Sequence, residues 1–244
     1  MAPDEPESHL AQASVDWTLE WDWVAAREEL ERALALDPDY VDARLALAEW
    51  CGVVAGDTDR GVREIERSKR LDPFSPRVGV MEGYNFIVGR RNEGAVRVYR
   101  AQREVNPEDP LAANNLALAI AALGRGAEAV AIMDQVLPGI QVPLRGSVVQ
   151  AYALSGEEAR ARTILEEMQE LRDGGGPVGA LHLAMGYASL GEIEQALTWL
   201  ERCFQDEGGT YALRDPAFDQ LRGEPRFQVL WDRVGLPGAP PPAR

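Results

Sequence analysis

The sequence predicts an all-α chain built from a repeated pair of helices, and three observations carry this prediction. Strand signals are nearly absent, since the chain has no run of alternating β-branched residues and no Asn-Gly hairpin turn. Apolar residues recur instead at intervals of three and four, the spacing that places them on one face of a helix. A longer period, close to 34 residues, runs through most of the chain.

The long period consists of a turn residue, a small residue five positions later, a large apolar residue four further on, and a small or apolar residue three beyond that. In the first copy these are Trp21, Ala26, Leu30 and Ala33, and Pro38 stops the helix because proline lacks the N–H that would continue it. The spacings between successive turn residues are 35, 34, 34, 32 and 35 for Trp21, Gly56, Arg90, Gly124, Gly156 and Gly191.

This pattern resembles the tetratricopeptide repeat (TPR), in which small residues let two antiparallel helices approach while a large residue fills the gap between them. The resemblance implies a right-handed superhelix, or α-solenoid, of about six TPR helix pairs, because one pair cannot bury its own apolar face. Repeat 2 has one extra residue in its first helix or turn. The predicted array covers residues 7–208, divided into 7–40, 41–75, 76–109, 110–141, 142–176 and 177–208.

The segment after the last repeat, residues 209–236, is predicted to cap the array with a C-terminal helix. Phe227, Leu230, Trp231 and Val234 fall on one helical face, as a helix covering the last repeat requires. The remaining residues, 1–6 and the Pro-rich 237–244, are predicted to be disordered tails.

The two ends together resemble a narrower group of proteins. The stretches "EWDWVAAREELERALALDPDY" and "DPAFDQLRGEPRFQVLWDRVGLP" are similar to the TPR region that follows the effector domain of bacterial winged-helix regulators, serine/threonine kinases and adenylate cyclases. No such effector domain is visible in the 244 residues. Two interpretations therefore stay open: a stand-alone relative, or a fragment of a larger bacterial signalling protein.

Charge and composition exclude several classes of partner. The net charge of −15 and a pI near 4.6 argue against nucleic acid and against an anionic membrane surface. The N-terminal "MAPDEPESHL" is no signal peptide, and the longest apolar run, Leu116 to Leu123, is too short to span a bilayer. A cytoplasmic location is predicted, with Cys51 and Cys203 as buried free thiols.

No motif in the sequence predicts catalysis, a metal or a cofactor. His9 and His182 have no partner at metal-ligand spacing. "GRGAEA" matches a dinucleotide fingerprint formally, but a helix precedes it where the fingerprint needs a strand. The chain is therefore predicted not to be an enzyme.

The TPR resemblance implies that the inner faces of the first helices form a concave groove for a peptide or protein segment. Polar groove residues need a partner or water, so Tyr84, Asn114 and Gln150 are the strongest ligand candidates, while apolar ones also serve packing. The carboxylate clamp of some TPR proteins is not reproduced, because Val80 and Tyr84 occupy its lysine and asparagine positions. The predicted groove residues are Arg77, Val80, Tyr84, Val88, Asn114, Leu118, Gln150, Leu181 and Met185, with Ile87, Leu111, Ala121, Ala122, Gly146, Leu154, Val178 and Ser189 at further groove positions.

A second candidate surface is basic and comprises Arg90, Arg91, Arg97 and Arg100. An acidic partner could bind there, including the acidic first repeat of a second copy in a homodimer. The alternative is a solvated convex face without specific contacts. The leading hypothesis for function is a non-catalytic interaction module, or scaffold, that binds a protein segment in the groove; the alternative is a regulatory or sensor domain of a larger signalling protein.

Three tryptophans in seven residues raise the question of an aromatic ligand platform. Trp17 and Trp23 fall at packing positions of the first repeat, and we expect both to be buried. Trp21 stands where a turn glycine is usual, and its role is left open by the sequence.

Overall fold

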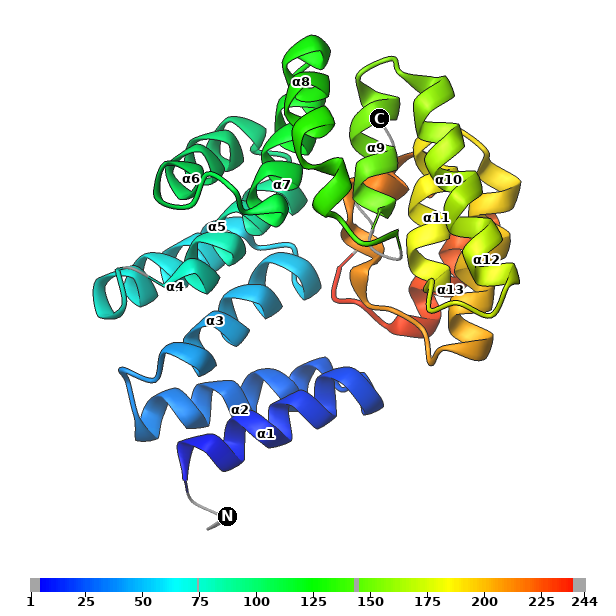
Figure 1. Cartoon of the computed structure of the whole chain (residues 1–244). Coiled ribbons are helices and arrows are strands. Elements are labelled where there is room, and N and C mark those ends of the chain that lie inside the picture. Colours follow the sequence, from blue (N-terminus) through cyan, green and yellow to red (C-terminus); the bar gives the residue numbers. More distant parts are fainter. Residues whose placement is uncertain (1–4, 74, 143–144, 239–244) are drawn as a thin grey trace.

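The computed structural model describes residues 5–73, 75–142 and 145–238, which contain helices and turns but no strand. The all-α prediction is confirmed. The helices form successive pairs (Figure 1). The first helices of the pairs are α1 (Pro6–Val15), α3 (Val41–Glu49), α5 (Pro76–Val88), α7 (Pro110–Ala122), α9 (Gly146–Leu154) and α11 (Ala180–Ser189). The second helices are α2 (Trp23–Leu36), α4 (Thr58–Leu71), α6 (Asn92–Val105), α8 (Gly126–Val136), α10 (Glu158–Asp173) and α12 (Ile193–Asp206).

The turn residue picked out by the long period has the same backbone conformation in every repeat. Glycine adopts this left-handed region at no steric cost, whereas other residues lose about 1–2 kcal/mol there. The turn residue between the two helices of a pair is left-handed even in the two repeats where it is not glycine. The φ angles are 53° at Trp21, 73° at Gly56, 58° at Arg90, 75° at Gly124, 81° at Gly156 and 74° at Gly191.

Two of the first helices end in a wider, π-helical turn. After α1 the turn is η1 (Asp16–Glu20), and after α3 it is η2 (Trp50–Val54). A π-helical turn accommodates one residue more than an α-helical turn. The extra residue of repeat 2 lies in this π-helical turn, and the left-handed turn at Gly56 follows it as in the other repeats.

The interior of the array follows the small-large-small pattern. Ala26, Leu30 and Ala33 are fully buried in the first repeat, and Tyr99 takes the large position in the third. Tyr99 packs so closely that a Cβ added to Gly83 would lie 2.3 Å from its ring. Cys51 and Cys203 are buried free thiols, as predicted.

The C-terminal segment Thr210–Leu236, called the strap below, covers the last repeat. It contains the short helices η5 (Ala212–Arg214) and η6 (Pro216–Leu221), followed by α13 (Pro225–Val234). Helix η6 packs on α11, and α13 packs on α12. The capping helix predicted from the apolar face of residues 227–234 is confirmed: Phe227, Leu230, Trp231 and Val234 are buried.

The strap also reaches the opposite end of the array, which the sequence did not predict. In Figure 1 its orange and red segments lie inside the curve of the helices, between α3 and α11. Arg214 Nε donates a hydrogen bond of 3.1 Å to the Val54 carbonyl oxygen, and Tyr211 Oη donates to Glu49 Oε1 at 3.2 Å. The strap therefore joins the first repeats to the last across the concave face.

Trp17, Trp21 and Trp23 are the residues of the first repeat that contact the C-terminal part of the chain. The rings of Trp17 and Trp23 pack against Tyr211 at centroid distances of 5.4 and 6.4 Å, and both tryptophans are buried, as predicted. Trp21 packs edge-on against Phe204 at 5.7 Å. The cluster is thus a structural contact between the two ends of the chain and not an open aromatic platform.

The helix pairs run from Pro6, the first residue of α1, to Asp206, the last residue of α12. The predicted limits of the array are residues 7 and 208. Of the two tails predicted to be disordered, residues 1–4 and 239–244 lie outside the described residues.

Candidate functional site

A pocket of ≈ 550 Å³, which we call the concave pocket, lies beside the strap on the concave face. Its walls come from the groove-facing ends of three first helices, from the start of two second helices and from the strap. Among the predicted groove residues, Leu118 and Gln150 line it, together with the further groove positions Ile87, Ala122 and Leu154. The remaining lining residues are Arg90, Asn92, Ile193, Pro216, Asp219 and Gln220.

Six of the eleven lining residues are apolar, and the polar one that is buried is Gln150. Gln150 is only 4% exposed, yet its Oε1 accepts no hydrogen bond from the residues that the structure describes. Asn114, on the neighbouring α7, is equally buried and donates to Ser147 Oγ at 2.8 Å, while its Oδ1 accepts no hydrogen bond from the residues that the structure describes. A buried carbonyl oxygen without a donor is costly, and of these two amides only Gln150 lines the concave pocket.

The two charged residues that line the pocket, Arg90 and Asp219, form an ion pair with each other. Asp219 of the strap forms ion pairs with Arg90 and with Arg222, and Arg90 Nη1 also donates to the Arg214 carbonyl oxygen at 3.0 Å. The Arg222 side chain is almost fully buried. The concave pocket therefore presents apolar surface and amide groups, with little net charge.

The other predicted groove residues lie outside this pocket. Arg77 is exposed and pairs with Asp42 of the preceding repeat. Tyr84 lies near the strap: burial raises the pKa of its hydroxyl well above the ordinary value, and Asp215 raises it further. Val88 is buried. Val80, Leu181 and Met185 are partly buried, the last two packed against the main core.

The predicted basic surface is largely paired within the chain. Arg90 pairs with Asp219, Arg91 with Asp59 and Arg100 with Glu128. Arg97 is exposed on α6. An acidic partner would have to compete with three existing ion pairs, and the binding of such a partner stays a prediction.

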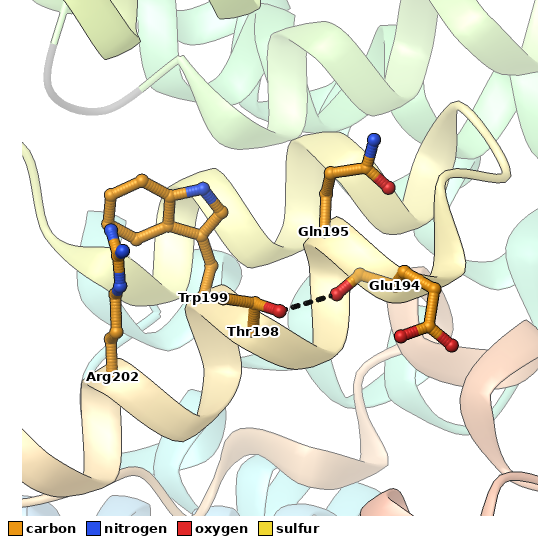
Figure 2. Close-up of a pocket in the computed structure, with 5 residues that line it drawn as sticks. All are labelled: Glu194, Gln195, Thr198, Trp199 and Arg202. Atoms are coloured by element: carbon orange, nitrogen blue, oxygen red, sulfur yellow. Dashed lines mark hydrogen bonds between the residues drawn. The ribbon is translucent and has the colours of Figure 1, made fainter.

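A second hollow lies on the outer side of α12, where Glu194, Gln195, Thr198, Trp199 and Arg202 line it (Figure 2). The Thr198 hydroxyl donates to the Glu194 carbonyl oxygen at 2.8 Å, and the Arg202 guanidinium lies 4.5 Å from the Trp199 ring centroid. All five side chains come from one helix, so the hollow is shallow. It offers no convergent polar groups to hold a ligand.

Neither a metal site nor a membrane span emerges from the described residues. Within residues 5–73, 75–142 and 145–238, no three histidine, cysteine or carboxylate side chains gather where they could hold a metal ion. The helices of this part of the chain are also too short or too polar to cross a bilayer.

Comparison with known proteins supports the repeat. Residues 80–142 match the family model described as "Tetratricopeptide repeat". No curated protein sequence matches the chain.

Solved structures of similar fold include three bacterial examples. A structure from a functional characterization of Pseudomonas aeruginosa pilF has a TM-score of 0.55 and 18% identity, covering 85% of this chain and 94% of that one. The MamA protein has a TM-score of 0.51 and 16% identity, covering 85% and 97%. A tetratricopeptide repeat protein from Parabacteroides merdae has a TM-score of 0.53 and 15% identity, covering 94% and 92%.

These comparisons define the class of protein. Residues 80–142 carry the tetratricopeptide repeat, and the chain has the fold of tetratricopeptide-repeat proteins. Such arrays are generally non-catalytic interaction scaffolds that offer a concave surface to other proteins. The resemblance to the TPR regions of regulators, kinases and cyclases stays a prediction.

The sequence missed the strap's contribution to the site. Pro216, Asp219 and Gln220 line the concave pocket, although they follow its lining residues on α5, α7 and α9 by more than 60 residues. The available signal was the density of charged residues in an otherwise apolar segment, since Arg214, Asp215, Asp219 and Arg222 surround buried Phe218 and Leu221. Nothing in the sequence pairs those charges with Arg90.

Proposed function

We propose that this protein is a non-catalytic interaction module that binds a segment of another protein in the concave pocket. The observation that carries the proposal is the concave pocket itself, whose wall combines the apolar Leu118 and the half-exposed Leu154 with polar side chains such as Gln220. An extended peptide supplies N–H donors along its backbone, and its side chains supply apolar surface for Leu118 and Leu154. The pocket's ≈ 550 Å³ accommodates a few residues of such a segment.

The lining residues set the chemistry of that segment. Because Arg90 and Asp219, the charged residues that line the pocket, already pair with each other, a strongly charged segment gains little there. We therefore expect a short segment with one or two apolar side chains and no requirement for a charged group. Control of an attached effector domain, the second hypothesis, would use the same pocket; that role, the cytoplasmic location and the signalling context are predictions from the sequence.

The experiment is a selection of peptides from a random displayed library on the whole protein, followed by Kd measurements. Leu154 is 49% exposed and lines the pocket, whereas Leu71 is 40% exposed and lies at the end of α4. These two leucines form a matched pair, because neither substitution by aspartate opens the core. We expect Leu154→Asp to weaken binding by at least about tenfold, as burying an unpaired charge costs more than 1.4 kcal/mol.

Leu71→Asp is expected to leave the Kd unchanged within about twofold, because surface substitutions away from a site have small effects. Equal weakening by both variants would contradict the proposed site. A selection that yields no binding peptide would contradict the proposed function itself.

A further inference from the structure

A second pocket, of ≈ 310 Å³, lies where the turns of repeats 2 and 3 meet the strap. We call it the turn pocket. Three of its lining residues are glycines, Gly52, Gly56 and Gly89, and the strap contributes Arg214. Arg90 lines both the turn pocket and the concave pocket, so the two pockets are adjacent.

Arg214 is a buried cation without a carboxylate partner. The residue is 5% exposed and forms no ion pair with any acidic group in the part of the chain that the structure describes. Its Nε donates to the Val54 carbonyl oxygen and its Nη2 to the Pro237 carbonyl oxygen, and its guanidinium lies 4.8 Å from the Trp231 ring centroid. Nη1 has no acceptor among the described residues.

The surroundings of Arg214 leave its charge uncompensated. Arg90 and Arg222 lie nearby, and both of them pair with the same carboxylate, Asp219. Burial, and then the charges of Arg222 and Arg90, lower the pKa of Arg214 to about 10. A buried guanidinium is normally paired with an anion, because an unpaired buried charge is costly.

Neither acidic residue of the turn pocket, Asp57 or Asp59, forms an ion pair with Arg214 among the described residues. Asp59 pairs with Arg91, and Asp57 caps helix α4 by accepting a hydrogen bond of 2.9 Å from the Arg60 N–H. After these contacts are counted, the Arg214 guanidinium is the cation of the pocket that lacks a partner. A ligand of negative charge would supply the counter-ion.

The Arg214 guanidinium lines the turn pocket beside the glycine turn of repeat 2. A Cβ added to Gly56 would lie 3.1 Å from Arg214 Nη1, so the bare glycine lets the guanidinium pack against this turn. Gly56 also has a φ of 73°, which other residues adopt only at a cost. Thr58, at the start of α4, places a hydroxyl group at the same pocket.

We propose that the turn pocket binds a small oxyanion, a carboxylate or a phosphate, through Arg214 Nη1 with the Thr58 hydroxyl as a second donor. Planar guanidinium groups are suited to such oxyanions, and hydrogen bonds between charged partners are roughly twice as strong as neutral ones. This site is distinct from the concave pocket and does not depend on peptide binding there.

The test is a titration of the whole protein with sodium acetate and with sodium phosphate, followed by the backbone amide NMR signals of Gly56, Thr58 and Gly89. Sodium chloride at matched ionic strength is the reference. The proposal predicts saturable shifts of these three signals with at least one oxyanion and not with chloride. Shifts with acetate alone or phosphate alone would identify the oxyanion.

Two substitutions test whether the shifts of the NMR signals depend on Arg214. Arg214→Met keeps the apolar stem and is expected to weaken binding by at least about tenfold, the effect of one charged hydrogen bond. Arg97→Met, at an exposed arginine of α6, is expected to leave it unchanged. If Arg214→Met does not fold, the wild-type comparison with chloride and the Thr58→Val variant decide. Shifts equal to those in chloride, or retained fully in Arg214→Met or Thr58→Val, would overturn the proposal.

Discussion

The indole Nε1 of Trp23 donates a hydrogen bond of 2.8 Å to the carbonyl oxygen of Val234, although 211 residues separate the two along the chain. This bond lies among the ring contacts of Trp17 and Trp23 with Tyr211. A solenoid of repeats normally has contacts only between neighbouring repeats. Here the strap adds contacts between the first repeat and the end of the chain, and it covers part of the concave face.

The ion pairs of Asp219 are expected to hold the strap on the third repeat. Asp219→Asn leaves Arg90 and the buried Arg222 without a counter-ion, which we expect to lower the free energy of unfolding by about 3 kcal/mol. Asp42→Asn is the matched control, because Asp42 pairs with an exposed arginine, Arg77, and its loss is expected to cost less than about 0.5 kcal/mol. Urea denaturation measures both. Equal effects of the two variants would contradict this role for Asp219.

We expect glycine to be required at position 61 because the Asn85 side chain leaves no room for a Cβ, and not because of the backbone conformation of Gly61. Alanine in a helix is normally favoured over glycine by about 0.8–1.0 kcal/mol. At Gly61, however, an added Cβ would lie 2.4 Å from Asn85 Oδ1, and Asn85 is fully buried. We therefore expect Gly61→Ala to destabilise the protein by about 1–3 kcal/mol.

A double-mutant cycle checks this cause. Asn85→Ala removes the obstructing amide, so the Gly61→Ala/Asn85→Ala protein is expected to be more stable than the sum of the single effects by at least about 0.5 kcal/mol. Gly223→Ala is the control, since its Cβ would meet nothing within 4 Å. Strict additivity of the two substitutions would show that the clash with Asn85 is not the reason.

The Glu49 carboxyl group makes the strap contact sensitive to pH. Burial raises the pKa of Glu49 above its ordinary 4.5, against the opposing effect of the hydrogen bond from Tyr211. Below about pH 4.5 the group is protonated in both the folded and the unfolded chain. As the pH rises, the unfolded chain loses this proton first, so the ionised Glu49 destabilises the folded state increasingly until its folded pKa is passed.

Glu49→Gln keeps an acceptor for Tyr211 and removes this ionisation. The stability of the variant relative to wild type is therefore expected to rise between pH 4 and pH 7, as measured by urea unfolding at each pH. A difference that does not change with pH, or that falls over this interval, would show that Glu49 is not destabilised by its surroundings.

The repeat could be predicted from the sequence because its rules are local. The small and large positions and the left-handed turn act within about 34 residues, so the turn was located even at Trp21 and Arg90, where glycine is absent. The apolar face of residues 227–234 predicted the capping helix for the same reason. Packing of Trp17 and Trp23 also followed from their positions in the repeat.

The site could be predicted only in part, because one wall of the concave pocket comes from the strap, which is distant in sequence from the groove residues. Leu118 and Gln150, two of the predicted groove residues, line the concave pocket. The pairing of Arg90 with Asp219 depends on two segments 129 residues apart, and no spacing rule links them. The sequence therefore suggests a separate basic surface for Arg90, and it does not predict which part of the groove the strap covers.

The central claim is that the strap is bound across the concave face in solution, and exchange of the Trp23 indole hydrogen with solvent tests it most directly. A hydrogen bonded to the Val234 carbonyl oxygen inside a buried junction exchanges only when the junction opens. We predict that the Trp23 indole signal in deuterated water decays at least about a thousandfold more slowly than that of a free indole, since opening then costs about 4 kcal/mol. Exchange at the free rate, while the amides of α7 and α9 remain protected, would contradict the account.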